Sequence, residues 1–331
     1  MKIPSISIAL ATYNGEKYLE EQLKSIEKQS MPPSEIIISD DVSTDSTLDI
    51  IERFKERVKY EIKIKKNRTN AGYRRNFLDC AKECQGDIII FCDQDDIWRN
   101  DKIHEIIKYF SNSKNLAVTH DCSANLMATG TSIKSYFHHL GLSGFNPSLN
   151  IKGCCMAYRR ELIELVGFPS MEFNWGHDNW ISFTSKALNL HGILEKQLID
   201  YRIHSSNTSG VLPGGRCRIR RLLRSIKIEH FSTASQLEDY VSYYVKPTEI
   251  EMHHAAIDQF KSALSEAQRR HAYDAISNRE KVCQLWQSEA WQHPAPRTLT
   301  ALRHFFTGAY RSNDGVLGLM QDIYGDRHGS L

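Results

Sequence analysis

Three carboxylates follow one short apolar run, and they are the residues of this sequence best suited to chemistry. The run is Ile88–Phe91, and Asp93, Asp95 and Asp96 lie just beyond it. A run of this length is typical of a buried strand, and clustered acids at its end are costly unless their charge is compensated. A divalent cation is the simplest compensation, because hard cations bind carboxylate oxygens. A solvated acidic turn is the alternative interpretation.

Two earlier apolar runs also end in polar residues that are suited to binding. Ser5–Ala11 leads into Thr12–Gly15, and Glu35–Ser39 leads into Asp40 and Asp41. The carboxyl ends of parallel strands open on one edge of a sheet, where the ligands of such sheets bind. Three strand ends that converge in this way are a more specific signal than a single Asp-x-Asp triplet.

The segments between these strand ends predict the fold class. Apolar spacing favours helices over residues 16–29, 47–58 and 77–84, and an edge strand over residues 60–65. Strands that alternate with helices at this rhythm are typical of a parallel, doubly wound sheet. We therefore expect an α/β domain with a mostly parallel sheet flanked by helices. Further strands are expected over residues 116–119, 151–158 and 192–201.

Two downstream positions are candidates for catalysis and ligand binding. Asp178 lies in a segment dense in aromatic residues, and a carboxylate in such surroundings suits acid–base chemistry. The alternative for Asp178 is a cap of the helix expected over residues 180–190. His204 lies in a polar loop just past the last expected strand, where a metal or phosphate ligand and a structural histidine are both consistent with the sequence.

Composition sets the broad class of the protein. The 331 residues include 42 basic and 40 acidic side chains, so the net charge of +2 does not favour nucleic-acid binding. The eight cysteines contain no Cys-x-x-Cys pair, which argues against a zinc or redox motif. No apolar run approaches the roughly 20 residues of a membrane span, and we expect no signal peptide. The expectation is a cytoplasmic protein with free thiols.

The character of the chain changes after residue 212. Residues 213–215 form a short Pro-Gly-Gly linker, and Arg216–Lys227 combines basic residues with apolar ones at helical spacing. We therefore predict one domain over residues 1–212 and a mainly helical region over residues 213–331. A basic amphipathic helix indicates docking on a membrane surface. A solvated helix packed on the core, or homo-oligomerisation through the helical region, are the alternatives.

Five motifs, in order and at the expected spacing over residues 3–210, resemble family 2 glycosyltransferases of the GT-A fold. The resemblance is strongest to bacterial transferases of O-antigen, capsule and cell-wall polysaccharides, including rhamnosyltransferases. It does not extend to the C-terminal third. The motifs are Ala11-Thr-Tyr-Asn-Gly15, Asp40-Asp-Val-Ser-Thr-Asp-Ser-Thr47, Asp93-Gln-Asp-Asp-Ile-Trp98, Gly176-His-Asp-Asn-Trp180 and Tyr201-Arg-Ile-His204.

The resemblance implies roles for individual residues. Asp178 matches the family's catalytic base, although His177 stands where the family more often has a glutamate. The resemblance places Asp95 and His204 at the metal, and Asp96 is an extra acid that a shifted register would make the ligand. The nucleotide-sugar site is implied to include Ala11, Thr12, Tyr13, Asp41, Gly72, Arg75, Asn76, Asp93 and Gln94. The donor and acceptor pocket is expected to include Trp98, Trp175, His177 and Trp180.

The function implied by the resemblance is inverting transfer of a sugar from a nucleotide-sugar donor to a hydroxyl group of a surface glycan or lipid-linked acceptor. Mn²⁺ or Mg²⁺ is the implied cofactor, and dTDP-rhamnose or a UDP-hexose is the expected donor. Such acceptors place the enzyme in the cytoplasm or on the inner face of the inner membrane. A nucleotidyltransferase is disfavoured because Asn14–Lys17 lacks a glycine run. A degenerate binding or scaffold protein of the same fold is the second alternative.

Overall fold

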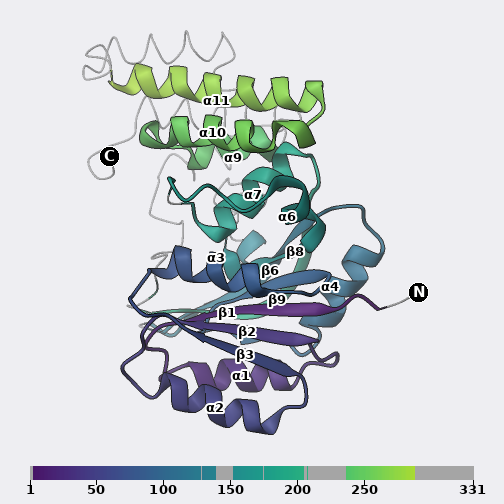
Figure 1. Cartoon of the computed structure of the whole chain (residues 1–331), viewed down its shortest axis with the longest axis vertical. Coiled ribbons are helices and arrows are strands. Elements are labelled where there is room, and N and C mark those ends of the chain that lie inside the picture. The colour runs from purple at the N-terminus through teal and green to yellow at the C-terminus, as the bar shows by residue number, and fades with distance from the viewer. Residues whose placement is uncertain are drawn as a thin grey trace. The chain divides into compact units, whose positions relative to one another are not determined.

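The chain divides into two compact units, one of residues 1–139 with 150–211 and one of residues 140–149 with 212–331. The first unit contains the sheet, and the second is helical over its described part (Figure 1). The structure, a computed structural model, describes residues 3–127, 129–138, 152–173, 175–204, 207 and 236–287.

Nine strands of the described residues form one mixed sheet in the order β3-β2-β1-β4-β8-β6-β9-β5, with β7 paired to β6. Strands β3, β2, β1 and β4 are parallel, and so are β6 and β9, whereas β8 runs antiparallel to both β4 and β6. The strands are β1 (Ile6–Thr12), β2 (Glu35–Asp40), β3 (Glu61–Lys66), β4 (Ile88–Cys92), β5 (Ile97–Trp98), β6 (Ala117–Leu126), β7 (Thr131–Ile133), β8 (Met156–Arg159) and β9 (His191–Ile203).

Helices cover both faces of the parallel strands, as the expected α/β architecture requires. Helices α1 and α2 lie on one side of β1, β2 and β3, and α3 lies on the other side (Figure 1). Each of the three helices buries one apolar face, which is how an amphipathic helix is held on a sheet. The helices of this unit are α1 (Leu19–Glu27), α2 (Thr47–Arg57), α3 (Tyr73–Glu83), α4 (Lys102–Ser111), α6 (Arg160–Val166) and α7 (His177–Ala187).

The ends of three parallel strands meet at one edge of the sheet. Thr12 at the end of β1 pairs with Asp40 at the end of β2, and Leu10 pairs with Cys92 at the end of β4. All residues of these three strands are buried, which explains their continuous apolar runs. The predicted convergence of the strand ends is therefore confirmed.

The last strand is longer than its sequence pattern predicts. Strand β9 continues to Ile203 because it pairs with β6 along nearly its whole length, with register shifts near His120 and Asp121. The short strand β5 also pairs with β9, and Ile97 lies opposite Asp200. These pairings bring the end of β9 to the acidic turn that separates β4 from β5. The strand expected over residues 151–158 begins instead as a 3-10 turn, Gly153–Cys155.

Three helices make up the described part of the second unit, which agrees with the predicted helical C-terminal region. They are α9 (Gln236–Tyr244), α10 (Ile250–Phe260) and α11 (Glu266–Gln287). No helix within the described residues has the length and apolar character needed to cross a membrane. The basic segment Arg216–Lys227 lies outside the described residues.

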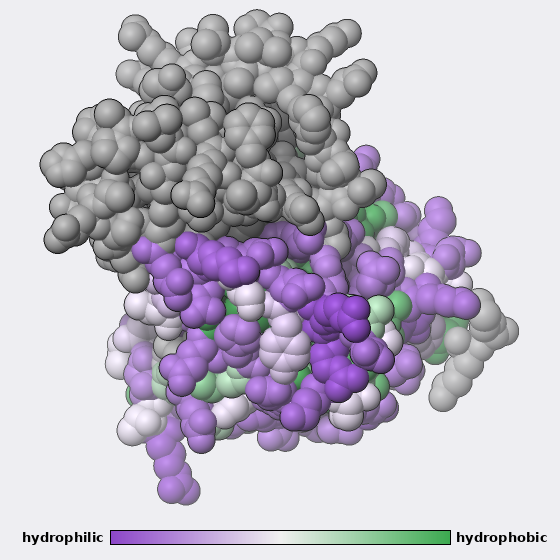
Figure 2. Space-filling model, turned by 90° about the horizontal axis from the view of Figure 1, so that it is seen from above, coloured by the Kyte–Doolittle hydropathy of each residue, from purple (hydrophilic) through white to green (hydrophobic). Residues whose placement is uncertain are grey.

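The described surface is mainly hydrophilic on the face that Figure 2 shows, and apolar residues on it are scattered. Seven cysteines lie in the described residues, and all seven are buried and free, as expected for a chain without disulfides. A few large apolar side chains are exposed, and three of them, Tyr13, Val42 and Tyr73, follow strands β1 and β2 or begin α3. Apolar surface is therefore exposed at the edge where the strand ends meet.

Candidate active site

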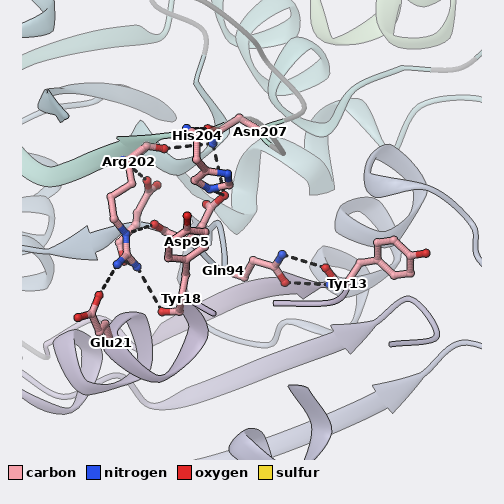
Figure 3. Close-up of polar contacts among 9 residues, drawn as sticks. Tyr13, Tyr18, Glu21, Gln94, Asp95, Arg202, His204 and Asn207 are labelled. Atoms are coloured by element: carbon pink, nitrogen blue, oxygen red, sulfur yellow. Dashed lines mark hydrogen bonds and ion pairs between the residues drawn. The ribbon is translucent and has the colours of Figure 1, made fainter. Parts of the chain in front are cut away.

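The acidic turn between β4 and β5 brings Asp95 against His204. The Asp95 Oδ2 atom lies 2.9 Å from the His204 Nε2 atom and 3.4 Å from the Asn207 Nδ2 atom (Figure 3). Both partners follow the end of β9, far from Asp95 in the sequence. Burial raises the pKa of the Asp95 carboxyl, although His204 acts to lower it. The predicted pair of one acid and one imidazole is therefore assembled at the sheet edge.

The spacing of this pair fits a divalent cation. Two ligand atoms in neighbouring positions of an octahedron, with bonds of about 2.1 Å, lie about 3 Å apart. The Asp95 Oδ2 and His204 Nε2 atoms are 2.9 Å apart, which matches this spacing, and in this structure the two atoms are within hydrogen-bond distance of each other. A carboxylate oxygen and an imidazole nitrogen are ligands that Mn²⁺ accepts, and the carboxylate also suits Mg²⁺.

Asp96 contacts other groups. Its side chain is fully buried, and its Oδ1 atom accepts a hydrogen bond of 3.3 Å from the backbone N–H of Arg202. Its Oδ2 atom is buried without a hydrogen-bond partner among the described residues. Ligand atoms of Asp93, Asp96 and Cys154 lie within 4.8 Å of one another, so Asp96 belongs to a cluster beneath the turn. Burial and the nearby Asp95 and Asp93 charges raise the Asp96 pKa well above its ordinary value.

A buried lysine lies close to this cluster. The Lys102 side chain is fully buried, donates a 2.9 Å hydrogen bond from Nζ to the Cys154 carbonyl and lies 3.9 Å from the centre of the Trp98 ring. Burial lowers the pKa of Lys102, and the nearby thiols and Asp96 act to raise it. An ammonium group near Asp96 therefore offsets part of the negative charge of the turn.

Asp41 is held by backbone groups at the start of α3. Its Oδ1 atom accepts hydrogen bonds from the Asn67 side chain and the Ala71 N–H, and its Oδ2 atom accepts one from the Gly72 N–H, each 2.8 Å long. Gly72 has a φ of +79°, a conformation that favours glycine. A carboxylate has about four lone-pair sites, so three hydrogen bonds leave Asp41 one acceptor site, and the residue is 2% exposed in this structure. Three exposed apolar side chains adjoin Asp41 or its partners. Val42 follows Asp41, Tyr73 follows Gly72, and Tyr13 follows Thr12, whose carbonyl accepts the Asp41 N–H.

The predicted segment Ala11–Tyr13 lies at the same edge, and Gln94 holds its end. The Gln94 amide bonds both the N–H and the carbonyl of Tyr13, at 2.9 and 3.0 Å (Figure 3). A Cβ atom at Gly15 would lie 2.4 Å from the Gln94 Oε1 atom, so a larger residue there would displace the Gln94 amide from Tyr13. Ala11 and Thr12 themselves are buried in the strand.

Asn76 and Arg75 occupy different environments on α3. Asn76 is buried, and its Nδ2 atom donates to the carbonyls of Ser39 and Thr12, which ties the ends of β1 and β2 together. Arg75 is partly exposed, and its Nε atom donates 2.7 Å to the carboxylate of Asp79 on the same helix. Asn76 therefore stabilises the ends of β1 and β2 from the interior, whereas Arg75 is partly exposed at the surface.

Asp178 lies within the first turn of α7. The N-cap residue is Gly176, so the interpretation of Asp178 as the helix cap is wrong. The Asp178 Oδ1 atom accepts a 2.8 Å hydrogen bond from the Asn179 N–H, and the side chain is partly exposed. Burial first, and then the charges of Asp95 and Asp178, raise the pKa of Asp93 to about 7. The Asp178 charge is therefore one of the causes that raise the pKa of Asp93.

His177 and the tryptophans pack in the interior. The His177 ring stacks on Phe77 with a centroid distance of 4.0 Å, and burial lowers its pKa. Trp180 is fully buried and donates its indole N–H to the Gly167 carbonyl, while Trp98 and Trp175 are each 3% exposed. These four side chains support the elements around the site, and in this structure they offer almost no surface to a ligand.

Several residues at the site had no role in the sequence interpretation. Arg202 lies inside the motif Tyr201–His204, two residues before His204, and this position in the motif is the feature of the sequence that could have indicated a role for it. Lys102, Tyr18 and Cys154 carried no pattern that separates them from ordinary core residues. Tertiary contacts bring these side chains to the acidic turn: Tyr18, Glu21, Lys102, Cys154, Arg202 and Asn207.

The mixed sheet with helices on both faces, and the acids and histidine gathered at the ends of its strands, agree with the GT-A glycosyltransferase fold. Solved structures share this fold. Staphylococcus aureus TarS 1–349 in complex with UDP-GlcNAc matches with a TM-score of 0.52 at 19% identity, over 86% of this chain and 91% of that chain. The mannosyltransferase PcManGT from Pyrobaculum calidifontis, in complex with GDP-Man and Mn²⁺, has a TM-score of 0.50 at 18% identity, over 95% of this chain and 88% of that chain.

The sequence comparisons show the family. The description of the matching family model is Glycosyl transferase family 2, and the match spans residues 7–167. The dTDP-rhamnosyl transferase RfbG of Shigella flexneri is 32% identical over 231 residues, which cover 64% of this chain and 78% of that protein. The UDP-Glc:alpha-D-GlcNAc-diphosphoundecaprenol beta-1,3-glucosyltransferase WfaP of Escherichia coli is 27% identical over 234 residues, covering 68% and 87%. The chain belongs to glycosyltransferase family 2.

The raised pKa of Asp93 predicts a pH dependence of stability without metal. Between about pH 4 and 7 the folded chain holds this proton more tightly than the unfolded chain, so ionising Asp93 costs stability as the pH rises. The Asp93→Asn variant should therefore gain stability relative to the unchanged protein from pH 5 to pH 8, on the order of 2 kcal/mol. Urea denaturation in EDTA measures the difference, and parallel curves for the two proteins would contradict the prediction.

Proposed function

We propose that this chain is an inverting glycosyltransferase that moves a sugar from a nucleotide-sugar donor to a hydroxyl group of a bacterial surface glycan or lipid-linked acceptor. The observation that carries the proposal is the Asp95 and His204 pair, whose ligand atoms are 2.9 Å apart at the strand edge. The charge of Asp178 on α7 is one of the causes that raise the pKa of Asp93 in the same turn. The reaction requires a stabilised leaving group and a base. We assign the first to Asp95 and His204 and the second to Asp178.

The nucleoside end of the donor is assigned to the edge formed by β1, β2 and the start of α3. We assign Asp41 to the base, because its carboxylate is oriented by three hydrogen bonds and keeps one acceptor site. The exposed Tyr13, Val42 and Tyr73 side chains supply apolar surface for a planar ring. Asp93 and Gln94, next along the edge, are assigned to the ribose and to the support of Tyr13.

The diphosphate end is assigned to Asp95 and His204, which would hold Mn²⁺ or Mg²⁺. Such an ion supplies Lewis-acid stabilisation of the charge that gathers on the nucleoside diphosphate as the sugar leaves. The protein's own contribution is to hold the Asp95 oxygen and the His204 nitrogen in neighbouring positions. Asp96 is not included in the proposed ligand pair, because its Oδ1 atom is bonded to the Arg202 N–H and its side chain is buried.

Asp178 is proposed as the general base. Its Oδ1 atom accepts a hydrogen bond from the Asn179 N–H, which orients the carboxylate, and the residue is partly exposed. The hydroxyl proton passes to Asp178 as the acceptor oxygen attacks the anomeric carbon and the nucleoside diphosphate departs. The name of WfaP gives UDP-Glc as the donor and a β-1,3 linkage in the product. Because glucose is α-linked in UDP-Glc, such a transfer inverts the anomeric carbon, and inversion needs one base and no covalent intermediate.

The donor and acceptor classes are proposed from the relatives. RfbG is named for dTDP-rhamnose, WfaP for UDP-Glc and a diphosphoundecaprenol acceptor, and TarS was solved with UDP-GlcNAc. All three donors are nucleoside diphosphate sugars with a pyrimidine base, which Asp41 suits because uracil and thymine present a ring N–H. We therefore propose dTDP-rhamnose or a UDP-hexose as the donor.

Replacing the proposed base should remove transfer and spare donor binding. The Asp178→Asn variant keeps the size of the side chain and cannot take the acceptor proton, so the rate of transfer should fall about 10²- to 10⁴-fold. Release of nucleoside diphosphate with acceptor present measures the rate, and the thermal shift caused by the donor measures binding. Glu161→Gln, an exposed change on α6, is the control. A variant with Asp178→Asn that keeps its rate within tenfold would exclude Asp178 as the base.

A panel of nucleotides should name the base and test the cation site. UDP, dTDP and GDP, each with and without Mn²⁺ or Mg²⁺, are added during thermal unfolding. A ligand at about 100 times its dissociation constant stabilises the native state by about 2.7 kcal/mol. We expect a metal-dependent shift with UDP or dTDP, smaller with GDP, and loss of the metal dependence in the Asp95→Ala variant. No shift with any nucleotide would overturn the proposed donor site.

For residues 213–331 we propose peripheral docking on the cytoplasmic face of the inner membrane, with homo-oligomerisation as the alternative. The support is the basic, apolar-spaced segment Arg216–Lys227. The full chain should co-sediment with liposomes that contain anionic lipid, and replacing Arg218, Arg220, Arg221 and Arg224 by Ala should reduce binding at least tenfold, since each basic residue near an anionic surface contributes about 1 kcal/mol. Equal binding by the fourfold variant would exclude this docking role.

A further inference from the structure

The Arg202 side chain connects three parts of the site that are distant in sequence. Its guanidinium donates to the carbonyls of Asp95 and Asp96 in the acidic turn and, at 3.2 Å, to the carbonyl of Tyr18 (Figure 3). It also forms an ion pair with the carboxylate of Glu21 on α1. The Arg202 side chain is 7% exposed, whereas that of Glu21 is 63% exposed. An interior cation is thus anchored to the surface of α1.

The Tyr18 ring contacts both Arg202 and His204. The guanidinium carbon of Arg202 lies 4.8 Å from the ring centroid, a cation–π distance. The His204 ring stacks on Tyr18 with centroids 4.5 Å apart and an angle of 25° between the planes. Tyr18 stands at the N-terminus of α1 and is only partly buried. The imidazole that faces Asp95 is therefore supported on its flat side by a residue of α1.

The backbone around His204 is bonded into the same group of residues. Asn207 accepts a hydrogen bond from the His204 N–H and donates 3.1 Å to the Arg202 carbonyl. The Asn207 amide also lies 3.4 Å from the Asp95 Oδ2 atom. Contacts from Arg202 to the turn, from Tyr18 to His204 and from His204 to Asp95 form a closed ring of interactions. Removing one member should loosen the rest, because the members share partners.

We propose that Tyr18, Glu21 and Arg202 are positioning residues that hold His204 beside Asp95 before any ligand binds, so that the N-terminal edge of α1 sets the affinity of the site for a divalent cation. The inference rests on the proposed function, which takes Asp95 and His204 as the cation ligands. Binding is stronger when the ligand groups are already ordered, because ordering them costs free energy that otherwise reduces affinity. None of the three residues touches the reacting atoms in this scheme.

Tyr18 is the member to change first, since Arg202 is buried and its loss risks the fold. The Tyr18→Leu variant removes the aromatic support, and Tyr18→Phe keeps it. In EDTA, the ¹⁵N and ¹H signals of the His204 ring report its contact with Asp95 without any metal. We expect these signals to move in the Leu variant and to stay in the Phe variant. Unchanged His204 signals in the Leu variant would overturn the positioning role.

The affinity for Mn²⁺ alone, measured by electron paramagnetic resonance on the full chain, tests the consequence. Tyr18→Leu should weaken it about tenfold, with the thermal midpoint in EDTA within a few degrees of that of the unchanged protein. An equal Mn²⁺ affinity, or a tenfold loss that Tyr18→Phe shares, would overturn the proposal. If the unchanged protein binds no Mn²⁺, the cation site of the proposed function fails, and the His204 signals still decide whether Tyr18 positions the ring.

Glu21→Gln supplies a second, exposed variant with a matched control. It breaks the ion pair with Arg202. Glu20→Gln is the same change at the preceding residue, whose carboxylate lies 2.8 Å from Lys24 Nζ on the same helix. We expect Glu21→Gln to weaken Mn²⁺ binding about threefold and Glu20→Gln to leave it unchanged. A common effect of both variants would show a general charge effect and would contradict the anchoring of Arg202.

Discussion

The crowding of three carboxylates at the end of β4, with Asp96 fully buried and Asp93 and Asp95 partly buried, is the constraint on which the rest of this structure depends. Burial raises the pKa of Asp93, Asp95 and Asp96, so each would ionise at a cost without compensation. The acids stand where they do because β4 lies beside β1 in the parallel part of the sheet. The site that we propose for an anionic leaving group therefore contains a cluster of acids, and it can stabilise an anion only when cations are held close by.

The chain supplies those cations from elements that the sheet topology brings together. Lys102 on α4 lies near the buried Asp96, and Arg202 at the end of β9 bonds the carbonyls of the turn. The His204 imidazole lies beside Asp95, with its Nε2 atom 2.9 Å from the Asp95 Oδ2 atom. The extension of β9 along β6, and the pairing of β5 with β9, are what place Arg202 and His204 there.

A second feature of the site is that its proposed functional residues come from separate secondary-structure elements. The edge proposed to bind the nucleotide is formed by β1, β2 and the start of α3, whereas Asp178 lies on α7. α3 packs between these regions, and its Phe77 side chain stacks on His177, the neighbour of Asp178. A transferase needs its leaving group and its base on opposite sides of the reacting sugar, and separate elements that share one core can hold both at a fixed separation.

The sequence by itself determined the parallel strands, the convergence of their ends, the family, and Asp95, Asp178 and His204 as candidates, because apolar runs and local motifs encode these features. It did not determine which acid of the turn meets His204, since Asp95 and Asp96 are adjacent and chemically identical. The tertiary structure decided that by bonding Asp96 to the Arg202 N–H, and it buried Trp98, Trp175 and Trp180. Tyr18, Lys102 and Arg202 act through contacts between residues far apart in the chain, and no local pattern records such contacts.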